Sequence, residues 1–168
     1  INSKNILVSR SLSKSYSLAG IRCGYCIGHE NLITTLYKIK DSYNVSYLSQ
    51  EIARVALLDQ NTMKANVEAI IETRELLREK LTEMGFYVYP SVTNFLWVKP
   101  VEITAEKLFN ELYKKNILIR YFNDNKTKDY LRITIGTAHQ VFSLIDSINE
   151  IINGLKNDWG SINFKKIW

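Results

Sequence analysis

The pattern that most constrains the fold is a run of apolar residues at three- and four-residue steps across residues 61 to 84. Its members are Met63, Val67, Ile70, Ile71, Leu77, Leu81 and Met84. This spacing places apolar side chains on one face of an α-helix. Gly85 follows directly, where a glycine can adopt the left-handed conformation that ends a helix. We therefore predict a long amphipathic helix from about Asn61 to Met84.

After this helix the apolar pattern alternates between strand and helix. It predicts strands at residues 86–90, 93–100, 117–122 and 130–136 and a helix at residues 104–115. Thr137 and Gln140 have the spacing of a capping box that begins a closing helix. The expected buried face of that helix is Val141, Leu144, Ile145, Ile148, Ile152 and Leu155. Together these elements predict a small α/β sandwich with helices on one side of a mainly antiparallel sheet.

The first part of the chain has a different organisation. Short β-rich runs at residues 5–9 and 23–28 predict two buried strands that flank a loop rich in serine. Helical spacing follows at residues 30–40 and 47–59, separated by the polar break "DSYNVS". The sequence therefore predicts two units, residues 1–60 and residues 61–168, the second containing the long helix.

Composition excludes several classes of protein. The chain has 168 residues, 46% of them hydrophobic and only two of them proline, which favours packed globular structure. The net charge of +5 comes from lysines that are scattered and form no basic block, so we expect no nucleic-acid partner. No run has the length of a membrane span, and the first residues do not form a signal peptide. We expect a soluble cytoplasmic protein.

The two cysteines, Cys23 and Cys26, have C-x-x-C spacing. A zinc site would need more ligands than two thiols and the distant His29 and His139 provide, so we predict no metal site. A redox dithiol usually begins a helix, whereas "RCGYCIG" has the pattern of a strand. We expect both to be buried, reduced thiols.

The stretch "SRSLSKSYSLAGIRCGY" (residues 9–25) carries the chemistry. Lysine is a nucleophile only when its amine is neutral, which burial or a neighbouring cation favours. Serine hydroxyls and an arginine nearby are donors for phosphate oxygens. Lys14, with Ser11, Ser13 and Arg22 around it, therefore has the parts of a pyridoxal-phosphate pocket. The alternative for Lys14 alone is an ordinary solvated lysine.

The order of these residues resembles the cofactor-lysine motif of fold type I aminotransferases, and most of all the histidinol-phosphate aminotransferase group. The resemblance implies that Lys14 bonds to pyridoxal phosphate and that Ser11, Ser13 and Arg22 bind its phosphate. Gly20 and Gly24 match family glycines that allow close approach of the backbone. The "DSYNVSYLSQEIA" segment is similar to the family segment that precedes its interdomain helices, but Asp41 and Ser42 stand where proline is frequent.

Three later segments extend the resemblance. "SVTNFLWVKP" resembles the family's Thr-Asn strand, and "ILIRYF" and "YLRITIGT" resemble its two strands that carry substrate arginines. The resemblance implies that Asn94, Arg120 and Arg132 bind substrate, Arg132 at the α-carboxylate and Arg120 at the distal anion. Independently, each arginine interrupts an apolar strand, where a buried guanidinium needs an anionic partner. A structural salt bridge is the rival interpretation.

The reaction that the resemblance implies is transamination in histidine biosynthesis, from L-histidinol phosphate and 2-oxoglutarate to imidazole acetol phosphate and L-glutamate. Lys14 would be both the covalent anchor and the general acid and base. The partners would be a small amino donor and a keto acid, and the full-length enzyme would be a homodimer. The alternatives are a threonine-phosphate decarboxylase of the same fold and a non-catalytic aminotransferase-like module.

The resemblance covers only the C-terminal half of the family fold. We therefore expect a fragment, with the end of the large-domain sheet in residues 1–60 and the small α/β sandwich domain in residues 61–168. Its first two strands would expose unpaired edges, and the isolated chain would bind pyridoxal phosphate weakly or not at all. For the tail, residues 157–168, we expect packing against the small domain, with an interface contact as the alternative.

Overall fold

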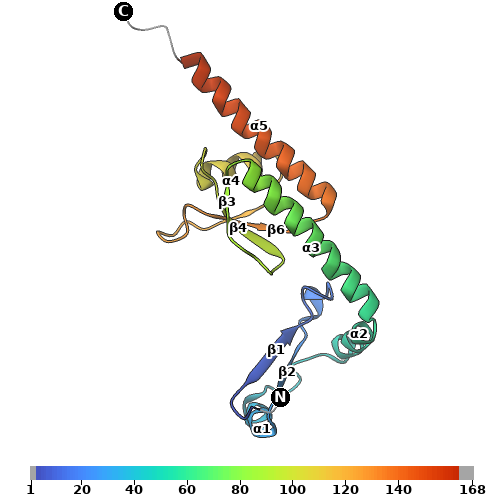
Figure 1. Ribbon diagram of the computed structural model, residues 1–168. Helices are drawn as coiled ribbons and strands as arrows, with labels where there is room; N and C mark the ends of the chain where they lie inside the picture. Colours follow the sequence, from blue (N-terminus) through green and yellow to red (C-terminus); the bar gives the residue numbers. More distant parts are fainter. Residues whose placement is uncertain (1–2, 163–168) are drawn as a thin grey trace, which may run out of the picture. The chain divides into compact units, whose positions relative to one another are not determined.

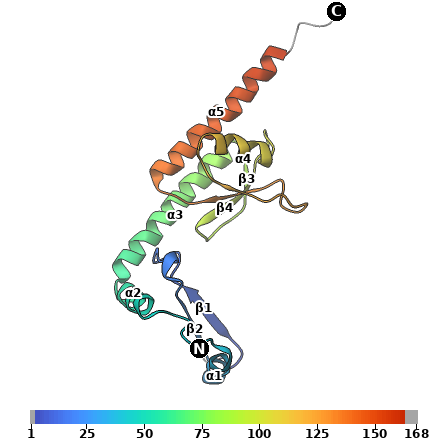
Figure 2. The same ribbon diagram turned by 180° about the vertical axis from the view of Figure 1, so that it is seen from behind.

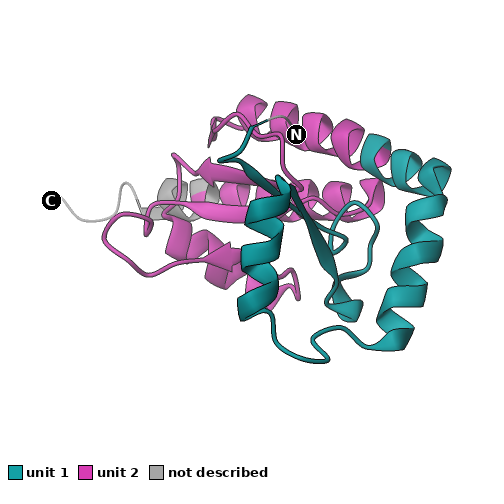
Figure 3. Cartoon of the chain, turned by 90° about the horizontal axis from the view of Figure 1, so that it is seen from below, with its two compact units in different colours: residues 1–68 teal, residues 69–168 magenta. Residues whose placement is uncertain are grey.

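The computed structural model describes the backbone of residues 3–162 and the side chains of residues 3–155, so the tail at residues 157–168 lies outside the described side chains. The chain divides into two compact units, residues 1–68 and residues 69–168, coloured separately in Figure 3. The division falls within the long helix α3 (Gln60–Glu83). Each unit is described by itself. The assignment of residues 1–60 and 61–168 to the large and small domains of an aminotransferase stays a prediction.

Unit 1 is built on two antiparallel strands, β1 (Leu7–Ser11) and β2 (Gly24–Gly28), which Figure 1 shows beside the label N. Their register pairs Leu7 with Gly28 and Ser11 with Gly24. β1 begins at Leu7, two residues later than the predicted strand at residues 5–9. Leu7 pairs with Gly28, and β2 cannot extend further because His29 caps the next helix. The loop between the strands contains the short 3-10 helix η1 (Ala19–Ile21).

The prediction that both strands are buried is wrong for the described chain. Most residues of β1 and β2 are exposed, and Leu12 and Ala53 are the only buried apolar residues that the structure describes in unit 1. Within unit 1, a sheet of two strands that helix α1 (Glu30–Ile39) covers only in part leaves most of its residues open to solvent. The same reason exposes Cys26 and leaves Cys23 half-buried, so the expected burial of these thiols is also wrong, although both cysteines are free. Within the described part of the chain, no three His, Cys, Asp or Glu residues gather into a metal-binding group.

Two helices complete unit 1 and both begin at a side-chain cap. Helix α1 (Glu30–Ile39) begins at His29, whose Nδ1 accepts from the amide of Asn31 at 3.3 Å, and Figure 2 shows it from behind at the far end of the hairpin. Helix α2 (Tyr47–Leu58) begins at Ser46, whose hydroxyl accepts from the amide of Ser49 at 3.1 Å. The "DSYNVS" segment is the turn between these helices, as predicted.

Helix α3 confirms the long predicted helix, and local chemistry sets both of its ends. At its start, the Asp59 carboxylate accepts from the amide of Thr62 at 3.1 Å. Hydrogen bonding from Thr62, from its side chain first and its amide second, lowers the pKa of Asp59. At its end, Gly85 has a φ of 82° and the amide of Phe86 donates to the carbonyl of Leu81 at 2.9 Å. This is the left-handed glycine ending that the sequence predicts.

Unit 2 contains an antiparallel sheet in the order β3-β4-β6-β5. Its strands are β3 (Tyr87–Val88), β4 (Phe95–Lys99), β5 (Arg120–Tyr121) and β6 (Leu131–Thr134). The edge strands β3 and β5 are shorter than the predicted runs at residues 86–90 and 117–122. β3 pairs only with Val98 and Lys99 of β4, and β5 only with Leu131 and Arg132 of β6, although both neighbouring strands continue further.

Helices α3, α4 (Ala105–Lys114) and α5 (Ala138–Ile162) cover one face of this sheet, and the core lies between. Leu96 and Val98 of β4 and Leu131 and Ile133 of β6 point into it, each with at most 2% of its surface exposed. Their neighbours along the strands point to the opposite face. The predicted α/β sandwich is confirmed.

The capping box at the start of α5 is confirmed. The amide of Thr137 donates to Gln140 Oε1 at 2.9 Å, and the amide of Gln140 donates to Thr137 Oγ1 at 3.3 Å. The predicted inner face is buried at Val141, Leu144, Ile145, Ile148 and Ile152, and Leu155 packs against the same core. Among the described helices, none combines the length and apolarity needed to cross a membrane.

Candidate functional site

The loop that carries Lys14 is closed by its own backbone. The amide of Leu12 donates to the carbonyl of Cys23 at 3.2 Å, and the amide of Leu18 donates to the carbonyl of Leu12 at 3.1 Å. Leu12 anchors the loop because its side chain is 1% exposed. The amide of Ser17 donates a hydrogen bond to the carbonyl of Lys14 at 3.0 Å, so Lys14 lies at the start of a tight turn.

The polar side chains of this loop form hydrogen bonds only within the loop, as far as the described residues show. The Ser11 hydroxyl donates to the Ser13 hydroxyl at 2.8 Å and accepts from the amide of Ser13 at 3.0 Å. Lys14 is exposed, and its side-chain amine forms no hydrogen bond or ion pair with any described residue. Arg22 has a φ of 53° and its Nη1 donates to the carbonyl of Ala19 at 3.1 Å, which leaves other guanidinium donors for an anion.

Gly24 makes this loop possible. A Cβ at this position would lie 2.6 Å from the carbonyl oxygen of Arg10, so the two backbones approach too closely for a side chain. The expected close approach at Gly20 is wrong in this unit, since nothing lies within 4 Å of where its Cβ would be. With hydroxyls, a guanidinium and an unpaired amine in one short loop, the donors fit a phosphate ester that also carries an aldehyde.

A separate hollow of about 730 Å³ lies elsewhere in unit 1, between the hairpin and α1. Tyr25, Ile33, Leu36 and Tyr37 contribute to its lining, whereas Ser11, Ser13, Lys14 and Arg22 do not. An open apolar hollow of this kind is typical of a surface that packs against more protein. We therefore separate it from the lysine loop.

Arg120 and Arg132 lie directly opposite each other on strands β5 and β6. Directly opposite residues share one face of a sheet, and here it is the face away from the helices, because Leu131 and Ile133 point to the core. The expectation that these guanidinium groups are buried is therefore wrong: Arg120 is exposed and Arg132 is half-buried. Neither forms an ion pair with a described residue, so the rival interpretation as structural salt bridges has no support here.

Aromatic rings take the place of a counter-ion for these two arginines. The Arg120 guanidinium lies 4.9 Å from the centre of the Phe122 ring, and Arg132 lies 5.5 Å from the Phe95 ring and 5.8 Å from the Phe122 ring. Ring faces attract cations without neutralising them. The pair therefore presents two positive charges that an anionic ligand can use.

The same face continues into a group of rings around Trp97. Trp97 stacks on Tyr130 with centres 5.4 Å apart, and the hydroxyls of Tyr130 and Tyr89 lie 3.4 Å apart. The hydrogen bond to Tyr130 is the main cause that raises the pKa of Tyr89, and burial adds to it.

Asn94, the third substrate residue expected from the sequence, precedes Phe95 at the start of β4 and is half-buried. Its carbonyl accepts from the amide of Ile135 at 2.9 Å. Of the site residues expected from the sequence, Ser11, Ser13, Lys14 and Arg22 lie in unit 1, and Asn94, Arg120 and Arg132 lie in unit 2. The sequence interpretation did not single out Arg74 of α3, although this residue interrupts the apolar repeat between Ile70 and Leu77.

Comparison with known proteins identifies relatives along most of the chain. The sequence profile of the aminotransferase class I and II family matches residues 1–148. Histidinol-phosphate aminotransferase 1 of Trichormus variabilis is 40% identical over 149 residues, which are 89% of this chain and 43% of that protein. Histidinol-phosphate aminotransferase of Synechocystis sp. is 41% identical over 151 residues, 90% of this chain and 43% of that protein.

A solved structure agrees with these sequence relatives. The histidinol-phosphate aminotransferase from Sinorhizobium meliloti, in complex with pyridoxal-5'-phosphate, superposes with a TM-score of 0.81 at 26% identity. The match covers 92% of this chain and 43% of that structure. The chain therefore spans less than half the length of the relatives that it matches.

Proposed function

The chain belongs to the class I and II aminotransferase family, and on this premise we propose that the whole protein is a pyridoxal-phosphate-dependent transaminase of L-histidinol phosphate. The amino acceptor would be 2-oxoglutarate, and the products would be imidazole acetol phosphate and L-glutamate, in histidine biosynthesis. The observation that carries the proposal is the pair Arg120 and Arg132, two neighbouring guanidinium groups with no carboxylate partner among the described residues.

The lysine loop supports the choice of cofactor. Ser11, Ser13 and Arg22 would hold the phosphate of pyridoxal phosphate, and Lys14 would bond to its aldehyde carbon. The absence of a Cβ at Gly24 leaves the backbone close enough for the loop to form. When bound, the cofactor supplies the aldehyde that takes up an amino group and a ring that accepts electrons from the substrate.

Each residue then has one task in the reaction. The amine of Lys14 would act as general base and general acid: it would remove the proton from the substrate α-carbon and later donate a proton back. Arg132 would grip the α-carboxylate of glutamate. Arg120 would meet the distal anion, which is the phosphate of histidinol phosphate in one half-reaction and the side-chain carboxylate of glutamate in the other. Asn94 would contact the substrate beside them.

The test uses the full-length protein, because the chain spans less than half of its relatives. We expect glutamate formation from 2-oxoglutarate when L-histidinol phosphate is the donor, and a loss of about 10²–10⁴-fold in kcat for Lys14→Ala. Lys38→Ala, an exposed lysine of α1, is the matched control and should leave kcat unchanged. Release of CO2 from threonine phosphate without transamination would instead favour a decarboxylase, and inactivity with both would favour a non-catalytic module.

We also propose that the full-length enzyme is a cytoplasmic homodimer, as the family resemblance implies. Sedimentation velocity would give twice the monomer mass at micromolar concentration. A monomer that retains full activity would contradict the proposal.

A further inference from the structure

Arg74 is the one charged residue that is buried among the described side chains, with 8% of its surface exposed. It lies on the inner face of α3, at a helical step between Ile70 and Leu77 where the pattern would otherwise place an apolar residue. A charge removed from water is destabilising unless its partners replace the lost hydration. The partners of Arg74 therefore show why the position holds an arginine.

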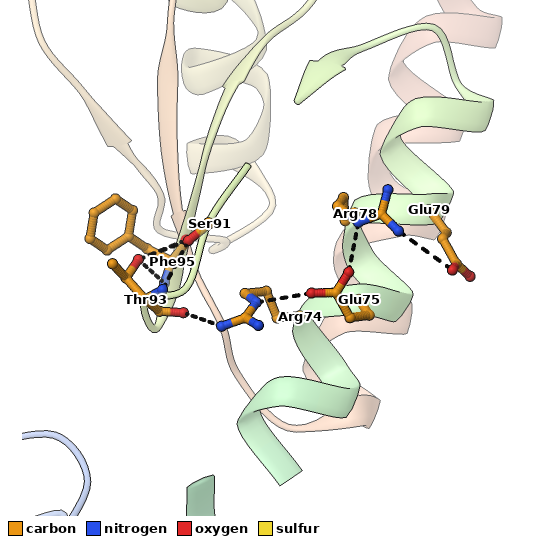
Figure 4. A network of polar contacts seen from close by, with 7 residues as sticks. All are labelled: Arg74, Glu75, Arg78, Glu79, Ser91, Thr93 and Phe95. Atoms are coloured by element: carbon orange, nitrogen blue, oxygen red, sulfur yellow. Dashed lines mark hydrogen bonds and ion pairs between the residues drawn. The ribbon is translucent and has the colours of Figure 1, made fainter. Parts of the chain in front are cut away.

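Arg74 bonds in two directions (Figure 4). Its Nε donates to Glu75 Oε1 at 3.2 Å, and its Nη1 donates to the carbonyl of Thr93 at 3.1 Å, in the segment that leads into β4. Glu75 is itself held by Arg78 at 2.7 Å, so the carboxylate is fixed from both sides. The Glu75 contact balances the charge of Arg74, whereas the Thr93 contact ties a helix to a segment 19 residues further along the chain.

That segment is fixed at three successive carbonyls. Thr93 accepts from Arg74, Asn94 accepts from the amide of Ile135 at 2.9 Å, and Phe95 accepts from the Ser91 hydroxyl at 2.7 Å. The backbone on both sides of Asn94 is thereby set. The side chain of Asn94 forms no hydrogen bond with any described residue, so its amide is left for a ligand.

We propose that Arg74 is a positioning residue: from helix α3 it holds the backbone at Thr93 so that the neighbouring Asn94 presents its side-chain amide to the substrate. This inference rests on the proposed function for the role of Asn94, but the contact between Arg74 and Thr93 is tested without it. Arg120 and Arg132 bind by charge, and Asn94 adds a directional contact whose strength depends on its orientation.

The first experiment tests the contact by amide hydrogen exchange in the full-length holoenzyme. Arg74→Met keeps an unbranched side chain but removes the charge and the hydrogen-bond donors. In this variant the amides of Ile135 and Phe95 should exchange about 10-fold faster. Arg78→Met is the matched control, because Arg78 bonds to Glu75 but to no atom of the segment at residues 91–95. In the control, exchange at these amides should stay within about 2-fold of the parent protein.

The conservative variant separates positioning from general stability. Arg74→Lys keeps the charge and can reach one partner, so exchange at Ile135 should lie between the values for the parent protein and Arg74→Met. Faster exchange throughout α4 and α5 in both variants, with no excess at Ile135, would overturn the proposal and leave Arg74 a stabilising residue only.

The second experiment measures how Arg74 acts on turnover. Arg74→Met should raise KM for the amino donor about 10-fold, with kcat changed less than about 2-fold and the absorbance of the bound cofactor unchanged. Asn94→Ala should raise KM similarly, and the double variant should resemble Asn94→Ala alone, because Arg74 acts through Asn94. Additive effects in the double variant would overturn the proposal.

If Asn94→Ala leaves KM unchanged, the proposed role of Asn94 fails, and the positioning role of Arg74 fails with it even if the exchange result stands.

Discussion

Three arginines in this chain show how the same side chain takes three roles from its surroundings. Arg22 lies in a left-handed turn at the end of η1 and donates to a local carbonyl. Arg74 is buried and divides its donors between a carboxylate and a backbone carbonyl. Arg132 lies over aromatic rings and forms no ion pair with a carboxylate of the described residues. The planar fork of donors suits all three settings, whereas the single ammonium of lysine would suit none of them as well.

Arg132→Lys tests the importance of that fork. The ammonium group keeps the charge but loses the two parallel donors that match a carboxylate, so the affinity of the full-length enzyme for glutamate should fall about 10–100-fold. Titration of the cofactor absorbance with glutamate would measure this. Arg54→Lys, at an exposed site on α2, is the control and should change nothing. Equal affinity in Arg132→Lys would contradict the assignment of Arg132 to the α-carboxylate.

The lowered pKa of the Glu75 carboxyl group leads us to expect that the stability of the fold depends on pH. Hydrogen bonds from Arg78 first and Arg74 second lower the pKa of Glu75 below its ordinary value of 4.5. A carboxylate with a lowered pKa in the folded state stabilises the fold above its unfolded pKa, and this contribution disappears as pH falls through the folded pKa. Unfolding midpoints measured from neutral pH down to about pH 3.5 should therefore fall less steeply for Glu75→Gln than for the parent protein.

The size of this effect is limited by solvent, because 42% of the Glu75 side chain is exposed. Solvent screening reduces the contribution to less than about 1 kcal/mol. Glu79→Gln is the control, since the Glu79 carboxylate meets Arg78 only at 3.7 Å. A parallel pair of curves for Glu75→Gln and the parent protein would contradict the prediction.

At the scale of elements, the sequence predicts what is local and misses what depends on distant partners. The spacing that leads to Gly85 and the pair Thr137 and Gln140 identify helix ends, because a cap needs only neighbours in the chain. The order of Ser11, Lys14 and Arg22 is local in the same way. By contrast, the pairing of Arg120 with Arg132 depends on strand register, which an arginine in an apolar run does not reveal.

The burial of individual side chains was the property that the sequence pattern predicted least well. A β-rich run such as residues 23–28 indicates a strand, but its burial depends on layers that pack over it, and unit 1 supplies few. Arg74 shows the opposite case, where a charged residue at an inward helical position is the detectable signal of a buried contact. Such an interruption predicts a partner without identifying Thr93 as that partner.

The capping box of α5 predicts a measurable loss of stability. Thr137→Ala removes the hydroxyl that accepts from the amide of Gln140, so the free energy of unfolding should fall by about 1 kcal/mol. Ser143→Ala, an exposed serine in the next turn of the same helix, is the matched control and should cost less than about 0.5 kcal/mol. Urea unfolding followed by circular dichroism would compare them. Equal losses in the two variants would contradict a capping role for Thr137.

At the scale of the whole molecule, the two units differ in how well they bury their own apolar residues. Unit 2 encloses a core between its sheet and three helices, while unit 1 buries Leu12 and Ala53 among its described apolar residues. Its large apolar side chains that remain exposed include Ile6, Leu7, Tyr25, Ile27, Tyr37, Ile39, Leu48 and Leu58. A surface of this kind needs further protein to cover it.

We therefore expect the isolated 168-residue chain to bind a dye for apolar surfaces strongly and to bind pyridoxal phosphate weakly or not at all. Dye fluorescence and cofactor absorbance, compared with the full-length protein at equal concentration, would measure both. A 1:1 absorbance band of lysine-bound cofactor in the isolated chain, lost on Lys14→Ala, would overturn the second expectation.

The cross-strand pair Arg120 and Arg132 has a consequence for how the sheet assembles. Strand side chains alternate between faces, so a slip of β5 by one residue would exchange Arg120 with Tyr121, which packs against the core. The slipped sheet would bury an unpaired charge and is therefore strongly disfavoured. Arg120, which we propose binds substrate, thus also favours the correct register of β5, because the slipped register would bury its charge and separate it from Arg132.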